Sequence, residues 1–233
     1  MSSIRSRPSM ENPSQKAAFL EYEADAWFER NLPYIERYNA NDDRVISLLE
    51  EYTVKPGSVL ELGCSAGHRL NGVLSKFKDC KVYGVEPSAR AIEYGRAKFP
   101  GVELKKGTAD NLSHLADGSV DIVILGFLLY VVDRSLLFRT IAEIDRVLAN
   151  HGLLVLVDFF SESPVKNEYR YINQFPAYSF KQNYDEIFTS SKIYYLLDKC
   201  TIDHNTRRPD ASEDYYNKFS ISLLKKDVVA SYK

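Results

Sequence analysis

The sequence predicts an α/β fold built on a mostly parallel, doubly wound sheet. Five short apolar runs alternate with segments of helical spacing between residues 58 and 157. Runs with few polar interruptions are typical of strands that are covered by helices on both faces. Right-handed crossovers between parallel strands give a doubly wound layout. Ligands of such sheets bind at the carboxyl ends of the strands.

The same alternation predicts the boundaries of the elements. Strands are expected over 58–62, 81–85, 102–104, 120–125 and 153–157, and helices over 70–77, 88–97 and 136–148. Ser88 suits an N-cap because its hydroxyl can accept from a free backbone N–H. After residue 165 the alternation stops. A short helix over 184–190 and two strands over 193–202 and 219–224 predict an antiparallel hairpin at the sheet edge.

The N-terminal part differs in composition from the centre. Residues 1–13 are polar, contain two prolines, and are expected to form a mobile tail. Residues 14–52 show helical spacing and predict helical segments, one of which Pro33 starts or breaks. Since 233 residues suffice for one sizeable domain, residues 14–233 are expected to form a single domain with an insertion at 165–190.

The overall composition excludes several classes of protein. Thirty basic against 32 acidic side chains give a formal net charge of −2, so no nucleic-acid partner is expected. The longest uncharged apolar run, 122–132, is too short to cross a bilayer, and no secretory signal is apparent. Three cysteines without close pairing indicate neither a disulfide framework nor a metal site. We therefore expect a cytoplasmic protein, monomeric or homodimeric, without a metal or a membrane partner.

The strongest chemical signal is the segment VLELGCSAGHRL at residues 59–70. An expected strand runs into a turn that contains Gly63 and Gly67, and an expected helix follows. Glycines allow a tight turn and a close approach of the backbone to a ligand. The spacing departs from the Gly-x-Gly-x-x-Gly pattern of dinucleotide sites, so a purely structural connection is an alternative.

Two acidic residues follow the next expected strands. Glu86 ends the second strand, at the position where a carboxylate accepts hydrogen bonds from ribose hydroxyls. Asp110 lies in GTADNL, residues 107–112, after the third strand, where its carboxylate could accept from an adenine amino group. Because the carboxyl ends of parallel strands meet at one edge, both acids are expected beside the glycine turn.

These segments resemble the class I methyltransferases that use S-adenosylmethionine. VLELGCSAGHRL resembles the first motif of that family, VYGVEPSARAI the second and GTADNL the third, while SVDIVILGFLLYVVD and HGLLVLVDFF resemble its fourth and fifth strands. The resemblance covers roughly residues 45–160. It implies a Rossmann-like seven-stranded sheet that binds S-adenosylmethionine and releases S-adenosylhomocysteine.

The chain departs from the family pattern at three places. Ser65 replaces the central glycine of the first motif, and Asn150-His151-Gly152 replaces the usual Pro-Gly-Gly. GFLLY follows the fourth strand in place of an Asn-Pro-Pro-aromatic tetrapeptide. The last departure argues against an adenine-N6 or glutamine methyltransferase.

A second resemblance concerns the flanks. EYEADAWFERN at 21–31 and the tyrosine-rich segment 169–188 are similar to parts of methyltransferases of bacterial surface-sugar and specialised-metabolite pathways. This similarity implies that N-terminal helices fold over the cofactor and that a lid follows the fifth strand. A core anchor is the alternative for Trp27, and Arg30 is expected to meet either the methionine carboxylate or a surface glutamate. The resemblances together imply a cofactor site formed by Trp27, Arg30, Asn31, Glu61, Gly63, Cys64, Ser65, Gly67, Glu86, Pro87, Ala109, Asp110 and Asn111.

Candidate acceptor-side residues follow the fourth and fifth strands. The candidate general bases are Tyr130 after the fourth strand, Asp158 at the end of the fifth strand and, on the cofactor side, His68 after the glycine turn. In the expected lid, Tyr171, Tyr178 and Tyr184 offer aromatic faces with hydroxyl tips, which suit a sugar or an aromatic polar metabolite. Packing is the alternative for each tyrosine.

The sequence thus predicts methyl transfer from S-adenosylmethionine to a hydroxyl or amine of a small molecule, with a sugar or a sugar-containing metabolite as one candidate acceptor. One alternative is a protein that binds the cofactor without transferring a methyl group, because binding residues do not by themselves imply a reaction. Another is a methyltransferase of tRNA or protein. The near-neutral charge and the absence of a separate RNA-binding module in the sequence count against it.

Overall fold

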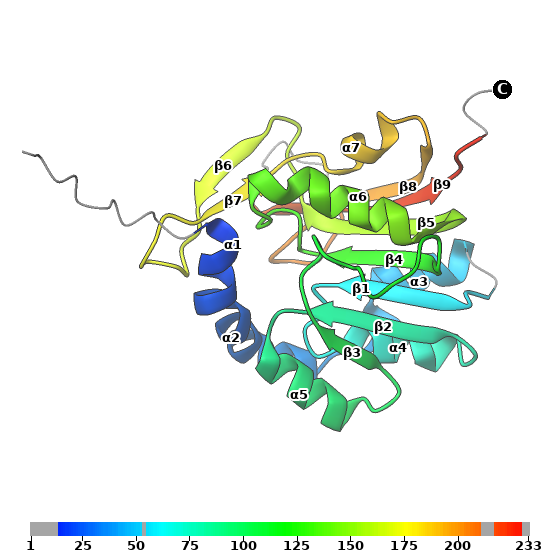
Figure 1. Cartoon of the computed structure of the whole chain (residues 1–233), viewed down its shortest axis with the longest axis horizontal. Helices are drawn as coiled ribbons and strands as arrows, with labels where there is room; N and C mark the ends of the chain where they lie inside the picture. Colours follow the sequence, from blue (N-terminus) through cyan, green and yellow to red (C-terminus); the bar gives the residue numbers. More distant parts are fainter. Residues whose placement is uncertain (1–13, 53–54, 211–216, 230–233) are drawn as a thin grey trace, which may run out of the picture.

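The computed structural model describes residues 14–52, 55–210 and 217–229, which contain a sheet covered by helices on both faces (Figure 1). Seven strands of these residues form the sheet, in the order β3-β2-β1-β4-β5-β9-β8. Their bounds are β1 Ser58–Leu62, β2 Lys81–Glu86, β3 Glu103–Lys106, β4 Val120–Gly126, β5 Leu148–Phe159, β8 Tyr194–Asp203 and β9 Lys218–Lys226. Strand β9 runs antiparallel to β5 and β8, and the other neighbours pair in parallel. The predicted sheet with its antiparallel edge hairpin is confirmed, whereas the expected mobile tail at 1–13 lies outside the described residues.

Two apolar cores lie on opposite faces of the sheet. Helices α6 (Leu137–Val147) and α7 (Asp185–Thr189) contribute to one core, and α3 (Arg44–Tyr52), α4 (His68–Lys76) and α5 (Ala89–Lys98) contribute to the other. Within β1, Leu60 belongs to the first core and Val59 to the second, because successive side chains of a strand point to opposite faces. Burial on both faces explains why the strands are nearly continuous apolar runs. Within the described ranges, no helix is long and apolar enough to span a membrane.

A helical segment from the N-terminal part lies across the carboxyl ends of the strands. It consists of α1 (Gln15–Ala18), the π-helical turn η1 (Phe19–Glu23) and α2 (Ala24–Glu36), drawn in blue near the arrowheads of β1 and β2 in Figure 1. A 3₁₀ turn, η2 (Ala40–Asp42), then leads to α3. Pro33 lies inside α2, so the expectation that it starts or breaks a helix is wrong. The proline removes one helical hydrogen bond, and the burial of Phe28 and Ile35 holds the helix in place.

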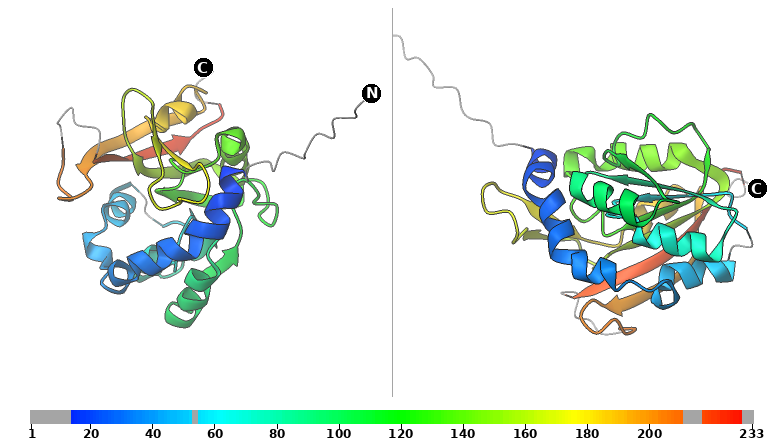
Figure 2. Two further views of the ribbon diagram at one scale, coloured as in Figure 1. Left: turned by 90° about the vertical axis from the view of Figure 1, so that its left-hand side faces the viewer. Right: turned by 90° about the horizontal axis from the view of Figure 1, so that it is seen from below.

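The insertion after β5 contains a two-stranded antiparallel hairpin, β6 (Val165–Glu168) and β7 (Tyr178–Lys181). The sequence does not predict these strands, because four residues are too few to show an apolar alternation. Gln15 connects α1 to the hairpin. Its amide group donates to the carbonyls of Val131 and Tyr178 and accepts from the N–H of Tyr178. The N-terminal helices and the insertion therefore close the same end of the sheet, as the left view of Figure 2 shows.

Gly95 in α5 packs against the turn that follows β1. A Cβ atom at Gly95 would lie 2.3 Å from the backbone oxygen of Ala66, which cannot rotate away. We therefore expect Gly95→Ala to lower the free energy of unfolding by about 1–3 kcal/mol, although alanine favours a helix by about 1 kcal/mol. Thermal unfolding measures the difference, with the exposed Glu93→Ala in the same helix as the control. A melting temperature of Gly95→Ala at or above that of the wild type would contradict this expectation.

Candidate cofactor and acceptor site

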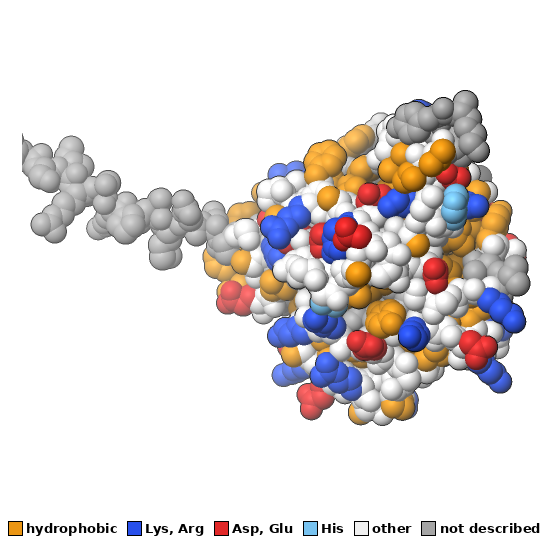
Figure 3. Space-filling view, turned by 45° about the vertical axis from the view of Figure 1, so that its right-hand side comes forward, with side chains coloured by type: hydrophobic (Ala, Val, Ile, Leu, Met, Phe, Trp, Pro, Cys, Tyr) orange, Lys and Arg blue, Asp and Glu red, His pale blue; other side chains and the backbone are white. Residues whose placement is uncertain are grey.

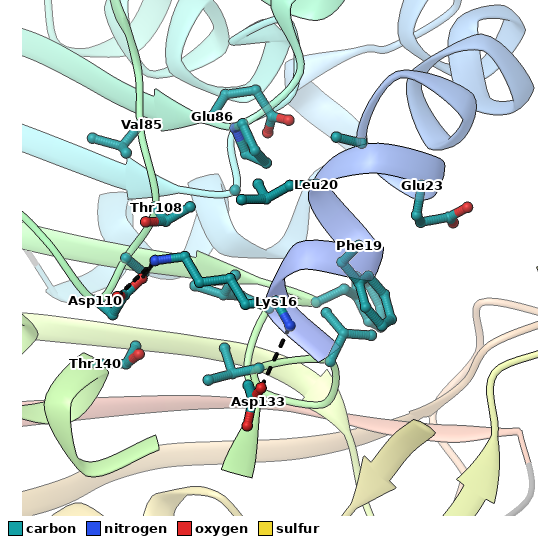
Figure 4. Close-up of a pocket in the computed structure, with 18 of the residues that line it drawn as sticks. Lys16, Phe19, Leu20, Glu23, Val85, Glu86, Thr108, Asp110, Asp133 and Thr140 are labelled. Atoms are coloured by element: carbon teal, nitrogen blue, oxygen red, sulfur yellow. Dashed lines mark hydrogen bonds and ion pairs between the residues drawn. The ribbon is translucent and has the colours of Figure 1, made fainter. Parts of the chain in front are cut away.

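A cavity of about 190 Å³ lies between the carboxyl ends of the strands and the N-terminal helices. Its wall comes from the loops that follow β1, β2, β3 and β4, from the segment α1-η1-α2, and from the insertion. Figure 4 shows Lys16 and Leu20 of the helical segment across from Glu86 and Asp110 of the strand ends. The predicted site residues that line the cavity are Trp27, Gly63, Ser65, Glu86, Pro87, Ala109, Asp110 and Tyr130.

The turn after β1 has a left-handed backbone at three residues. Gly63, Ser65 and Gly67 have φ angles of 70°, 50° and 78°. The glycines adopt this conformation without a steric penalty, whereas a serine does so at a cost of roughly 1–2 kcal/mol. The strained position of Ser65 directs its N–H to Glu86 Oε2 at 2.9 Å. Its Oγ is buried at the cavity and has no partner among the described residues.

Glu86 is fixed at the end of β2 by two backbone N–H groups. Ser65 donates to Oε2 and Ser88 donates to Oε1, each at 2.9 Å. Burial raises the pKa of Glu86 to about 7, although both hydrogen bonds oppose this shift. Each oxygen retains acceptor capacity, since a carboxylate oxygen has two lone pairs. The side chain is therefore an oriented acceptor at the strand end.

Asp110 forms an ion pair across the cavity. Lys16 Nζ of α1 lies 2.8 Å from both carboxylate oxygens. Burial alone would raise the pKa of Asp110, but hydrogen bonds from Lys16 and Thr108 lower it overall. Asp110 is therefore an anionic group that holds the N-terminal helix over the cavity.

Glu61 lies beneath the cavity and does not line it. Its Oε1 pairs with Arg69 Nη1 at 2.5 Å, and Arg69 also pairs with Asp43 at 2.9 Å. Burial raises the pKa of Glu61 to about 7 in spite of Arg69. Its Oε2 has no partner among the described residues. Because an arginine occupies one face of Glu61, its direct contact with a cofactor stays a prediction.

Of the three candidate bases, only Tyr130 lines the cavity. Asp158 Oδ2 accepts from the N–H of Tyr130 at 3.2 Å, and Oδ1 accepts from the N–H of Phe159 at 2.8 Å. Burial raises the pKa of Asp158 to about 7. Asp158 thus holds the loop after β4, and its carboxylate is occupied by backbone donors. This arrangement fits a cap better than a base.

His68 belongs to a different cavity, on the side of α4 that faces α2. Its ring makes edge contacts with Tyr34 and Tyr38 at centroid distances of 6.2 and 4.8 Å. Burial lowers the pKa of His68 to about 4. A neutral imidazole outside the main cavity is not positioned to take a proton from an acceptor there.

The remaining predicted cofactor residues do not line the cavity. Cys64 is buried in the second core, and Gly67 and Asn111 contribute only to the turns beside the site. Asn31 donates to the carbonyl of Trp27 at 2.8 Å. Arg30 pairs with the buried Glu23 and stacks 4.0 Å from the ring centroid of Tyr171, so it meets neither a surface glutamate nor the cavity.

The three lid tyrosines also lie outside the cavity wall. Tyr184 is buried and donates its hydroxyl to the carbonyl of Phe180 at 2.8 Å, which indicates packing. Tyr178 carries Lys166 over its ring at 3.6 Å, and Tyr171 is exposed under Arg30. The insertion reaches the cavity through Tyr169 instead. A role of the three tyrosines in acceptor binding stays a prediction.

Sequence reasoning did not single out Lys16, Glu23 or Arg69. Lys16 and Glu23 lie more than 80 residues before their partners Asp110 and Tyr169, so no local pattern connects them. Arg69 directly follows the glycine turn, in the first turn of α4. The signal available in the sequence was a charged residue close behind the glycine turn, at the start of the expected helix.

Comparisons with known proteins agree with this geometry. Residues 59–152 match the model of a methyltransferase domain family. The ubiquinone/menaquinone biosynthesis C-methyltransferase UbiE of Campylobacter jejuni is 30% identical over 122 residues, which cover 50% of this chain and 49% of that protein. A malonyl-[acyl-carrier protein] O-methyltransferase of Halorhodospira halophila is 25% identical over 123 residues, or 52% of this chain and 41% of that protein. The chain thus spans about half the length of the curated relatives it matches, or less.

Solved structures share the fold over a larger part of the chain. The 1,6-didemethyltoxoflavin-N1-methyltransferase of Burkholderia thailandensis, with 1,6-didemethyltoxoflavin and S-adenosylhomocysteine bound, has a TM-score of 0.68 at 12% identity and covers 97% of this chain and 93% of its own. A methyltransferase from Methanosarcina mazei has a TM-score of 0.60 at 18% identity and covers 77% of this chain and 97% of its own. The chain therefore shares the fold of these S-adenosylmethionine-dependent and related methyltransferases. Residues 59–152 are the part that matches the methyltransferase domain.

Proposed function

We propose that this chain transfers a methyl group from S-adenosylmethionine to a hydroxyl or amino group of a small molecule. The observation that carries the proposal is that Glu86 and Asp110 share one cavity with Tyr130 and Tyr169. Cofactor and acceptor can therefore meet in one space, closed by the N-terminal helices. When bound, S-adenosylmethionine supplies an electrophilic methyl group on a positively charged sulfur.

The polar groups at the strand ends fit this cofactor. Glu86 is oriented by two backbone donors and keeps lone pairs for ribose hydroxyls. Ser65 Oγ is a buried hydroxyl at the cavity that lacks a partner among the described residues. Asp110 offers a carboxylate to an amino group, with Lys16 as the neighbour that must share it or move. Positioning of the two reactants and exclusion of water by the apolar wall are then the main contributions of the protein.

The acceptor side of the wall favours an aromatic compound over a sugar. Phe19, Phe127 and Leu128 contribute apolar side chains to the cavity wall, which suit the face of a ring better than the many hydroxyls of a sugar. A flat ring with one hydroxyl or amino group matches such a wall. A tRNA or protein substrate has less support, since acidic and basic side chains are interspersed on the face in Figure 3 without a large patch of one sign.

Calorimetry tests the cofactor part of this proposal. We expect S-adenosylhomocysteine to bind with a micromolar dissociation constant, about −8 kcal/mol, and NAD not to compete. Isotope-labelled S-adenosylmethionine incubated with pools of phenols, amines and sugars then tests transfer by mass spectrometry. Tight binding of NAD and no heat with the adenosyl ligand would contradict the proposal. Cofactor binding without a labelled product in any pool would favour the protein that binds but does not transfer.

A further inference from the structure

Glu23, the last residue of η1, carries a buried carboxylate at the acceptor side of the cavity. Its side chain is 4% exposed and contributes to the cavity wall together with Tyr130 and Tyr169. Oε1 accepts from the hydroxyl of Tyr169 at 2.5 Å and from Arg30. Oε2 is buried and has no partner among the described residues. In Figure 4 the carboxylate points away from Glu86, so it is not part of the set of cofactor acids.

The two groups that donate hydrogen bonds to Oε1 of Glu23 both keep their protons. Burial, the neighbouring Tyr130 and the contact with Glu23 raise the pKa of Tyr169 far above its ordinary value, so its hydroxyl keeps its proton. Burial lowers the pKa of Arg30, but Glu23 raises it overall, so the guanidinium stays charged. Both donors hold one oxygen of Glu23 and leave the other as a fixed acceptor. A π-helical turn such as η1 frequently marks a functional site.

An unpaired carboxylate oxygen in a closed site is unfavourable and rare in native proteins. A ligand that donates a hydrogen bond removes this penalty. The aromatic ring of Phe19, 4.7 Å from that of Tyr169, lies beside the carboxylate and offers a face for stacking. A hydrogen-bond donor on an aromatic ring thus matches both the unpaired oxygen and the wall around it.

We propose that Glu23 Oε2 binds the hydrogen-bond donor of the acceptor, a hydroxyl or N–H group on an aromatic ring. This inference rests on the proposed function and names its acceptor class. A carboxylate or a carbonyl oxygen at the same position is rejected, because two acceptors face each other there. Glu23 is therefore a specificity-determining residue of the acceptor side.

Glu23→Gln is a sharp test because Tyr169 and Arg30 both donate to one oxygen. In the variant these donors attract the amide oxygen, so the amide NH₂ group takes the place of Oε2 and an acceptor becomes a donor at nearly unchanged volume. Glu21→Gln is the matched control, since Glu21 is exposed in the same turn and loses the same charge. The probes are 5-fluoroindole, whose ring N–H donates and cannot accept, and 5-fluoro-1-benzothiophene, in which a sulfur atom takes the place of that N–H. Fluorine NMR measures their binding to protein saturated with S-adenosylhomocysteine.

We expect the wild type and Glu21→Gln to bind 5-fluoroindole about tenfold more tightly than 5-fluoro-1-benzothiophene, and Glu23→Gln to reduce this ratio to about two or less. A wild-type ratio near one overturns the inference, even if the variant fails to fold. A folded Glu23→Gln that keeps the tenfold ratio also overturns it. If S-adenosylhomocysteine itself does not bind, the proposed function fails. If it binds and the ratio is near one, only the role of Glu23 is lost.

Discussion

Replacing Arg69 by methionine is expected to lower the free energy of unfolding by about 3–5 kcal/mol at neutral pH. Arg69 lies between Glu61 at 2.5 Å and Asp43 at 2.9 Å, and all three side chains are largely buried. Methionine fills much of the space but leaves both acids without a cation. For a chain of this size the loss corresponds to a melting temperature lower by about 6–20 °C, which circular dichroism measures on heating.

The pH dependence of this loss of stability separates the effect of the missing charge from the effect of altered packing. Arg69 lowers the pKa values of both Glu61 and Asp43, so without it both folded pKa values rise above those of the wild type and the native variant binds more protons near neutral pH. The variant therefore regains stability relative to the wild type as the pH falls from about 7 to about 5. Arg44→Met is the control, since its pair with the exposed Glu51 contributes less than about 1 kcal/mol. An Arg69→Met protein that melts like the control would show that the buried network does not support the site.

Replacing Glu86 by alanine is expected to weaken the binding of S-adenosylhomocysteine by about 1.5–3 kcal/mol, or about 10- to 150-fold. The reason is the loss of an oriented acceptor that the backbone of Ser65 and Ser88 holds at the end of β2. The melting temperature without ligand should change little. Calorimetry measures the affinity, and the exposed Glu93→Ala is the control. If Glu86→Ala instead unfolds the free protein while the surviving fraction binds normally, Glu86 is structural.

The affinity of the wild type should also depend on pH through Glu86. Burial raises its pKa in the free protein to about 7, so the carboxyl group titrates near neutral pH. Ribose hydroxyls are hydrogen-bond donors and favour the ionised form, so binding should tighten from about pH 6 to about pH 8 and then level off. In Glu86→Gln this part of the profile should be flat. A rising profile that survives in Glu86→Gln would assign the titration to another group.

The sheet and the cofactor end of the site were predictable from the sequence for one physical reason. Parallel strands buried on both faces are continuous apolar runs, and all of them end at the same edge. Residues that directly follow such runs, among them Gly63, Glu86 and Asp110, must therefore lie together, and the cavity lined by these three agrees with this. The order of the motifs then predicted a methyltransferase domain, whose family model residues 59–152 match.

The acceptor end was decided by the tertiary structure. Glu23 meets Tyr169 across 146 residues, and Lys16 meets Asp110 across 94. Periodicity indicates which face of a helix is buried but not which distant segment covers it. The same limit applies to Asp158, whose position near the end of a strand suggested a base. Its carboxylate accepts from the backbone N–H groups of Tyr130, in the loop after β4, and of Phe159. The sequence by itself therefore determined at which edge of the sheet the cavity lies. Only the packing of the N-terminal helices and the insertion decided which side chains complete its wall, because those contacts depend on segments with no local relation in the chain.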